Sequence, residues 1–126
     1  MNYLIYGHNN NNGMMFSELI KYQDKDFFNS HTKINLITST ENSTYNIISV
    51  FKSQIYSKTD EEVFKYYNYI DLSNEVLFYD YINNCKSQSL YNIAYNPEYG
   101  DKILTLSTCE YSKANGRFVI VAAKEK

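Results

Sequence analysis

The sequence predicts a mixed α+β domain with a mostly β core. Five runs rich in β-branched and aromatic residues are separated by polar turns, and three other stretches repeat apolar residues at helical spacing. In chain order these elements read strand, helix, two strands, two helices and two strands. The length of 126 residues suits one domain, so we expect residues 1–126 to fold as a single unit.

The first three strands are predicted from short apolar runs that end at turn residues. Residues 3–6 (Tyr-Leu-Ile-Tyr) form a run that stops at Gly7. Residues 34–38 and 44–51 are two further runs, joined by the polar segment 39–43. This pair predicts an antiparallel hairpin.

The three helices are predicted from apolar residues that share one helical face. In residues 14–22 the spacing is that of Met15, Leu19 and Tyr22. A second helix is expected to start at the capping residue Thr59 and to continue through Val63, Tyr66, Tyr67 and Ile70. A third covers residues 73–87, with Phe78, Ile82 and Cys85 on one face.

The last two strands flank a polar loop. From Leu104 to Thr108 apolar and polar residues alternate, which predicts a half-buried strand after a turn at residues 96–100. Residues 110–116 are polar, and residues 117–123 form a final apolar run. Five strands are few for a closed barrel.

Charge and composition argue against several classes of function. The net charge of −2 gives no basic footprint for nucleic acid. No apolar run approaches the ~18 residues of a transmembrane helix, and the N-terminus lacks the cationic start of a signal peptide. The two cysteines lack zinc spacing, so neither a metal nor a cofactor is expected.

Three residues at strand ends could together perform acyl transfer. Cys109 ends one strand, His8 follows another, and Arg117 opens the last. Separated residues can meet where strands end at one rim of a sheet. There a thiol, an imidazole and a guanidinium would supply a nucleophile, a proton donor and a cation for an oxyanion. The residues alone leave open that Cys109 is a small buried hydrophobe and that His8 is a surface residue.

Three segments carry a resemblance to a known family. Residues 105–110 (Thr-Leu-Ser-Thr-Cys-Glu) and, after a short loop, 116–122 (Gly-Arg-Phe-Val-Ile-Val-Ala) resemble the motif of class B sortases. Residues 6–9 (Tyr-Gly-His-Asn) are similar to the sortase histidine motif, and helical residues at about 59–90 are typical of class B. The resemblance implies an incomplete sortase-type β-barrel with helical insertions.

The resemblance also implies a cysteine transpeptidase of Gram-positive cell walls. Cys109 would attack the Thr carbonyl of an Asn-Pro-x-Thr sorting signal and form a thioester, while His8 protonates the leaving group. Arg117 would hold the substrate and stabilise the oxyanion. A cell-wall peptide amine would then take the protein. The site would face outside the cell, on a membrane anchor that this chain does not contain.

The remaining candidates have a structural interpretation beside the functional one. Ser107 and Glu110 match family positions near substrate, although Ser107 could be a solvent-facing strand residue and Glu110 a surface acid. Thr108 is expected to be structural, because its side chain alternates away from that of Cys109. Cys85 is interpreted as a core residue and His31 as a surface residue.

Class B sortases carry an anchor, helices and the first barrel strands ahead of the histidine strand, and this chain begins at that strand. It is therefore either a truncated product or a degenerate sortase, and we expect self-association through an exposed sheet edge. The alternative function is a catalytically impaired remnant that serves as a binding module. A papain-like hydrolase is rejected, because that family places its Cys before its His.

Overall fold

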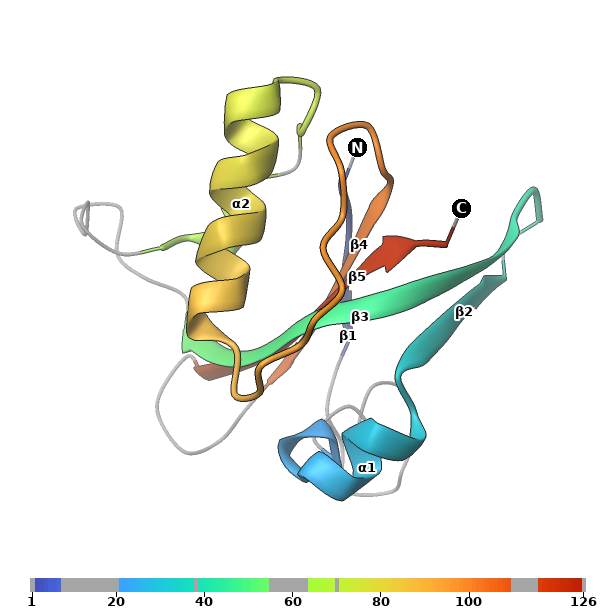
Figure 1. Cartoon of the computed structure of the whole chain (residues 1–126), viewed down its shortest axis with the longest axis vertical. Helices are drawn as coiled ribbons and strands as arrows, with labels where there is room; N and C mark the ends of the chain where they lie inside the picture. The colour runs from blue at the N-terminus through green and yellow to red at the C-terminus, as the bar shows by residue number, and fades with distance from the viewer. Residues whose placement is uncertain are drawn as a thin grey trace.

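The computed structural model describes residues 2–7, 21–37, 39–54, 64–69, 71–109 and 116–125. Its centre is one five-stranded sheet in the spatial order β1-β4-β5-β3-β2. The strands are β1 (Asn2–Gly7), β2 (Lys33–Ile37), β3 (Asn42–Gln54), β4 (Ile103–Cys109) and β5 (Gly116–Lys124). Figure 1 shows β3 as a long, curved strand that extends past the ends of its neighbours.

The sheet is antiparallel except at one pair. β1 runs parallel to β4, whereas β4–β5, β5–β3 and β3–β2 are antiparallel. The register of β3 against β5 shifts between Ile47 and Ser49. Such a bulge increases local twist and bend, which agrees with the curl of the sheet in Figure 1.

Helical segments that accompany the sheet in the described ranges include α1 (Lys25–Ser30), the 3₁₀ turn η2 (Tyr66–Asn68) and α2 (Glu75–Gln88), and residues 21–23 lie in another 3₁₀ turn. Asp24 is the N-cap of α1, and its side chain accepts from the Asp26 N–H. Asn74 is the N-cap of α2, and its side chain accepts from two N–H groups. Each cap satisfies donors that the first helical turn leaves open.

The two faces of the sheet are covered by different segments. The α2 face holds a cluster formed by α2, residues of 64–69, Leu72 and alternate residues of the inner strands, among them Ile103, Val119 and Val121. The opposite face holds a second cluster with α1, Leu104 and Ile120. β4 and β5 are consequently buried on both faces.

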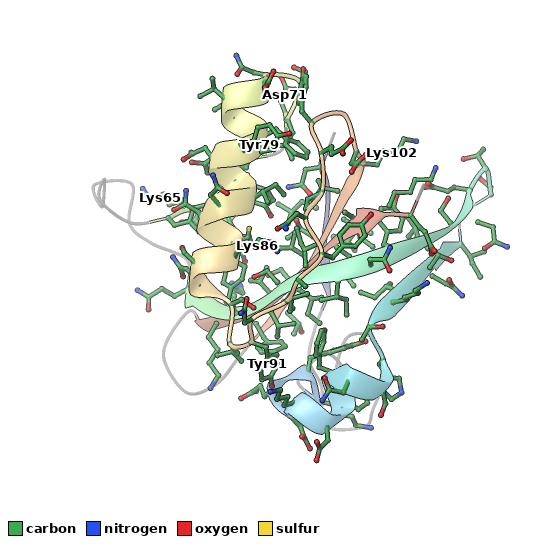
Figure 2. All side chains as sticks on the ribbon, in the orientation of Figure 1. Lys65, Asp71, Tyr79, Lys86, Tyr91 and Lys102 are labelled. Atoms are coloured by element: carbon green, nitrogen blue, oxygen red, sulfur yellow. The ribbon has the colours of Figure 1, made fainter. Side chains whose placement is uncertain are left out.

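The chain after α2 reaches the opposite face through Tyr91. The Tyr91 hydroxyl donates to the carbonyl of Tyr22, at 2.9 Å, and to that of Gln23. Its ring stacks on Phe28 of α1, with 5.6 Å between centroids. Figure 2 places Tyr91 beside α1, and Lys86, which lies on α2, donates to the carbonyl of Ile93 at 2.8 Å. These contacts connect α1 to the segment that leads into β4.

Most sequence-based predictions of elements are confirmed. β1, the β2–β3 hairpin, α2 with its buried face, β4 and β5 lie where they were expected. The turn ends at Gly100, whose φ of 100° is a conformation that glycine adopts readily. The prediction of a helix over 14–22 falls almost wholly outside the described residues, as do the proposed helix start at 59–63 and the loop at 110–115.

Two expectations are wrong and one element was missed. β4 is not half-buried, because residues 103–108 are all buried between two covered faces. Residues 64–69 contain the turn η2 and no α-helix. There Tyr66 and Tyr67 both pack on the cluster beneath α2, and the Tyr69 N–H donates to the carbonyl of Tyr66 at 3.2 Å, which is the i→i+3 bond of a 3₁₀ turn. The short helix α1 was not predicted; its signal is Asp24 as cap with Asp26 in the first turn.

Candidate active site

The strand ends that carry the predicted catalytic residues lie at one end of the sheet. In the register of β4 and β5, Cys109 pairs with Arg117. Arg117 in turn pairs with Ser53 of β3. Neighbouring strands are ~4.8 Å apart, so these three backbone positions form a short row across the sheet.

β1 ends beside this row. Gly7 is the last residue of β1 and pairs with Thr108, one position before Cys109. His8 follows Gly7 in the chain. His8 and Glu110 both lie outside the described residues. The ends of β1 and β4 and the start of β5 are therefore neighbours.

Arg117 belongs to the α2 face of the sheet. It alternates with Val119 and Val121, which pack in the cluster beneath α2. The side chain is half-buried, and its Nη1 donates to the carbonyl of Gly116 at 2.9 Å. A guanidinium presents five N–H donors in a planar fork, a geometry that suits an anion or a carbonyl oxygen.

Ser107 is buried beside Tyr66. It is 2% exposed, and its Oγ lies 2.7 Å from the Tyr66 hydroxyl. The structural alternative of a solvent-facing Ser107 is therefore wrong. Thr108 is buried as well, and its Oγ1 makes no hydrogen bond within the described part of the chain.

A second tyrosine contacts β4 closer to its start. The Thr105 hydroxyl donates to Asn2 Oδ1 at 2.9 Å, and the Tyr81 hydroxyl lies 2.6 Å from Thr105 Oγ1. Thr105 has one hydroxyl hydrogen, so Tyr81 must be the donor in this pair. Asn2 also donates to the carbonyl of Tyr69 at 2.8 Å. This network joins β1 and β4 to α2.

Cys85 and His31 lie where their structural interpretations place them. Cys85 is a free, fully buried thiol on α2, and burial raises its pKa far above the ordinary value. His31 is exposed and stacks on Phe27, with 4.1 Å between ring centroids. Neither residue lies in the row at the end of the sheet.

Comparison with known proteins decides the family. A protein-family model described as Sortase domain matches residues 1–125. The chain belongs to the sortase family. Its curated relatives include sortase B of Listeria monocytogenes, 36% identical over 121 residues, and sortase B of Staphylococcus aureus, 30% identical over 125 residues. The resemblance to class B is confirmed.

Solved structures give the same family for the fold. Sortase B from Listeria monocytogenes has a TM-score of 0.79 at 34% identity, with 97% of this sortase and 63% of that chain covered. A mutant form of Clostridium perfringens sortase B has a TM-score of 0.82 at 30% identity, with 99% and 57% covered. The predicted fold class, an incomplete sortase-type barrel with helices, is confirmed.

This sortase spans about half the length of the curated relatives it matches. The alignments cover 94% and 96% of the chain but 46% and 47% of those relatives. No helix in the described ranges is long and apolar enough to cross a membrane. Within the same ranges no three His, Cys, Asp or Glu side chains are grouped to hold a metal ion.

Sequence reasoning missed the two tyrosines that contact β4 of this sortase. Tyr66 was assigned to a helix face and Tyr81 was not singled out. The available signal was the pair Thr105 and Ser107, two polar residues in a strand that would be buried on both faces. Buried hydroxyls need hydrogen-bond partners, and a chain with 14 tyrosines offers many.

Proposed function

We propose that this chain is the catalytic part of a class B sortase, a transpeptidase that anchors surface proteins to the cell wall. The observation that carries the proposal is the register of the three strand ends. Cys109 pairs with Arg117, and the strand that leads to His8 ends opposite Thr108. Family membership and the class B relatives support the same chemistry.

The proposed reaction has two acyl transfers. The Cys109 thiolate attacks the carbonyl carbon of Thr in an Asn-Pro-x-Thr signal, and the collapsing tetrahedral intermediate expels the C-terminal fragment as an amine that His8 protonates. A peptidoglycan peptide amine then attacks the thioester, forms an amide and releases the thiol. Arg117 stabilises the oxyanion in both steps, a contribution on the order of 10²–10³ in rate.

The protonation states limit the rate. A free thiol has a pKa of ~8.5 and is mostly protonated at neutral pH. Cys109 must be a thiolate while His8 is a cation, so we propose that the competent pair is a minority form and turnover is slow.

Two further residues are proposed to serve the substrate. Ser107 and Glu110 lie on either side of Cys109 in sequence and are assigned to the sorting-signal site. A structure of Staphylococcus aureus sortase B is described as a substrate complex, and it matches this fold with a TM-score of 0.79 at 29% identity, covering 99% of this chain and 55% of that chain. We place the reaction at the outer face of the cell membrane, where the family acts.

The test is intact-protein mass spectrometry after incubation with an Asn-Pro-x-Thr peptide. The parent should cleave the peptide and carry an adduct on Cys109, whereas Cys109→Ala and Arg117→Ala should do neither. Cys85→Ala is the matched control and should keep the adduct, because Cys85 is buried in the core. A folded parent without cleavage or adduct would refute the proposal and favour the binding-module alternative.

A further inference from the structure

Near the end of β4, a tyrosine hydroxyl on the α2 face of the sheet contacts the strand. Among the described side chains of β4, Ser107 makes the hydrogen bond nearest to Cys109, and its partner is Tyr66. The side chain of Thr108, which lies between Ser107 and Cys109, makes no hydrogen bond within the described part of the chain. Cys109 is the last residue of the strand.

Tyr66 is itself rigidly placed. The side chain is 2% exposed, and its ring meets Phe51 of β3 edge-on, with 6.0 Å between centroids and 82° between planes. The ring of Tyr67 also meets it edge-on, with 5.2 Å between centroids and 83° between planes. Because the buried Tyr66 ring contacts two aromatic neighbours, its hydroxyl has one position. The hydrogen bond to Ser107 therefore fixes the position of β4.

Resting on the proposed function, we propose that Tyr66 is a positioning residue for Cys109. It acts through Ser107, which lies two positions before Cys109 in the strand. The bond holds the strand end in register with Arg117 across the β4–β5 pair. Small displacements at a reacting centre lower rates strongly, so one buried hydrogen bond at this point affects kcat more than substrate binding.

Tyr81 provides the matched control within the same network. Its hydroxyl also contacts β4 from the α2 face, at Thr105, four residues from Cys109. Both tyrosines are buried, and both become phenylalanine without a change in ring packing. Tyr81→Phe should therefore lower stability by an amount similar to Tyr66→Phe, yet leave Cys109 unchanged.

The experiment is a double-mutant cycle of Tyr66→Phe and Ser107→Ala, read first from the pH dependence of iodoacetamide alkylation at Cys109. Peptide mapping separates Cys109 from the buried Cys85. We expect the two single variants to displace the midpoint of the Cys109 profile equally, and the double variant to displace it no further. With the sorting peptide, the kcat of Tyr66→Phe should fall on the order of fivefold while its KM changes less than twofold.

Several results would overturn the assignment. A Tyr66→Phe profile that superimposes on the parent would do so, as would additive effects in the double variant or an equal displacement in Tyr81→Phe. Absence of peptide turnover in the parent refutes the proposed function, whereas the alkylation cycle still decides the role of Tyr66.

Discussion

The hydrogen bonds of Thr105 predict that removing the Tyr81 hydroxyl and removing the Thr105 hydroxyl lower the free energy of unfolding by different amounts. Thr105 donates its only hydroxyl hydrogen to Asn2 and accepts from Tyr81. In Tyr81→Phe the Thr105 hydroxyl keeps its acceptor, and no donor is left without a partner. In Thr105→Val, a change of similar volume, both the Tyr81 hydroxyl and Asn2 Oδ1 lose a buried partner.

The expected magnitudes follow from these losses. A hydrogen bond removed without an orphaned donor costs about 1 kcal/mol, whereas each buried polar group left unsatisfied costs about 1–3 kcal/mol. We therefore expect Tyr81→Phe to lower the free energy of unfolding by about 1 kcal/mol and Thr105→Val by about 2–4 kcal/mol. The double variant should be no less stable than Thr105→Val, because the Tyr81 hydroxyl is no longer there to be orphaned.

Urea unfolding followed by circular dichroism measures all three differences, provided that the dependence on denaturant stays the same among the variants. Asn2→Ala serves as a further comparison, because it removes the acceptor of Thr105 while Tyr81 keeps its own. If Tyr81→Phe proved as costly as Thr105→Val, the donor assignment in this network would be refuted.

Three other predictions concern stability and association. Asn74→Ala should cost about 1 kcal/mol, because two N–H groups of α2 lose their cap, and Asn74→Asp should restore it in thermal unfolding. Hydrogen bonding to Asp80, with burial, raises the pKa of Tyr69 to about 12. The stability that this hydrogen bond contributes is therefore complete below pH ~10 and is lost as pH rises through 12. Absorbance at 295 nm together with circular dichroism should show that Tyr69 ionises as the protein unfolds, and ionisation of Tyr69 well before unfolding would contradict this prediction. β1 pairs only with β4 among the described strands, so we expect self-association through its other edge, and a monodisperse monomer in light scattering at high concentration would count against this.

The parts of the fold that the sequence predicted are those set by local pattern. The β2–β3 hairpin and α2 follow from apolar periodicity and from polar turn or capping residues, and both are confirmed. Because the spacing of Val63, Tyr66, Tyr67 and Ile70 matches one face of a helix when tertiary contacts are ignored, a helix was wrongly predicted for residues 64–69. Their conformation is set by packing on α2 and β3, which no window of sequence contains.

For the site, sequence order and motif predicted the strand ends but not what supports them. The pairing of Cys109 with Arg117 follows once β4 and β5 form a hairpin. The parallel pairing of β1 with β4 joins residues about a hundred positions apart, and the sequence analysis did not predict it. Tyr66 and Tyr81 were missed because they lie 41 and 24 positions before their partners Ser107 and Thr105, and no local sequence pattern links residues so far apart.

Because β4 is buried on both faces, hydrogen bonds of its polar side chains can fix the position of the strand end. An antiparallel edge with one wet face would let water compete for Thr105 and Ser107, and their side chains would then fix nothing. In this structure both hydroxyls are removed from solvent and bonded to tyrosines that are themselves packed against aromatic rings. A buried hydroxyl can exchange its partner only by leaving a group unsatisfied, so the two bonds define one position of the strand. The hydroxyls of Thr105 and Ser107 thus set the register of β4. The apolar residues Ile103, Leu104 and Leu106 bury the strand, which keeps water away from these hydroxyls.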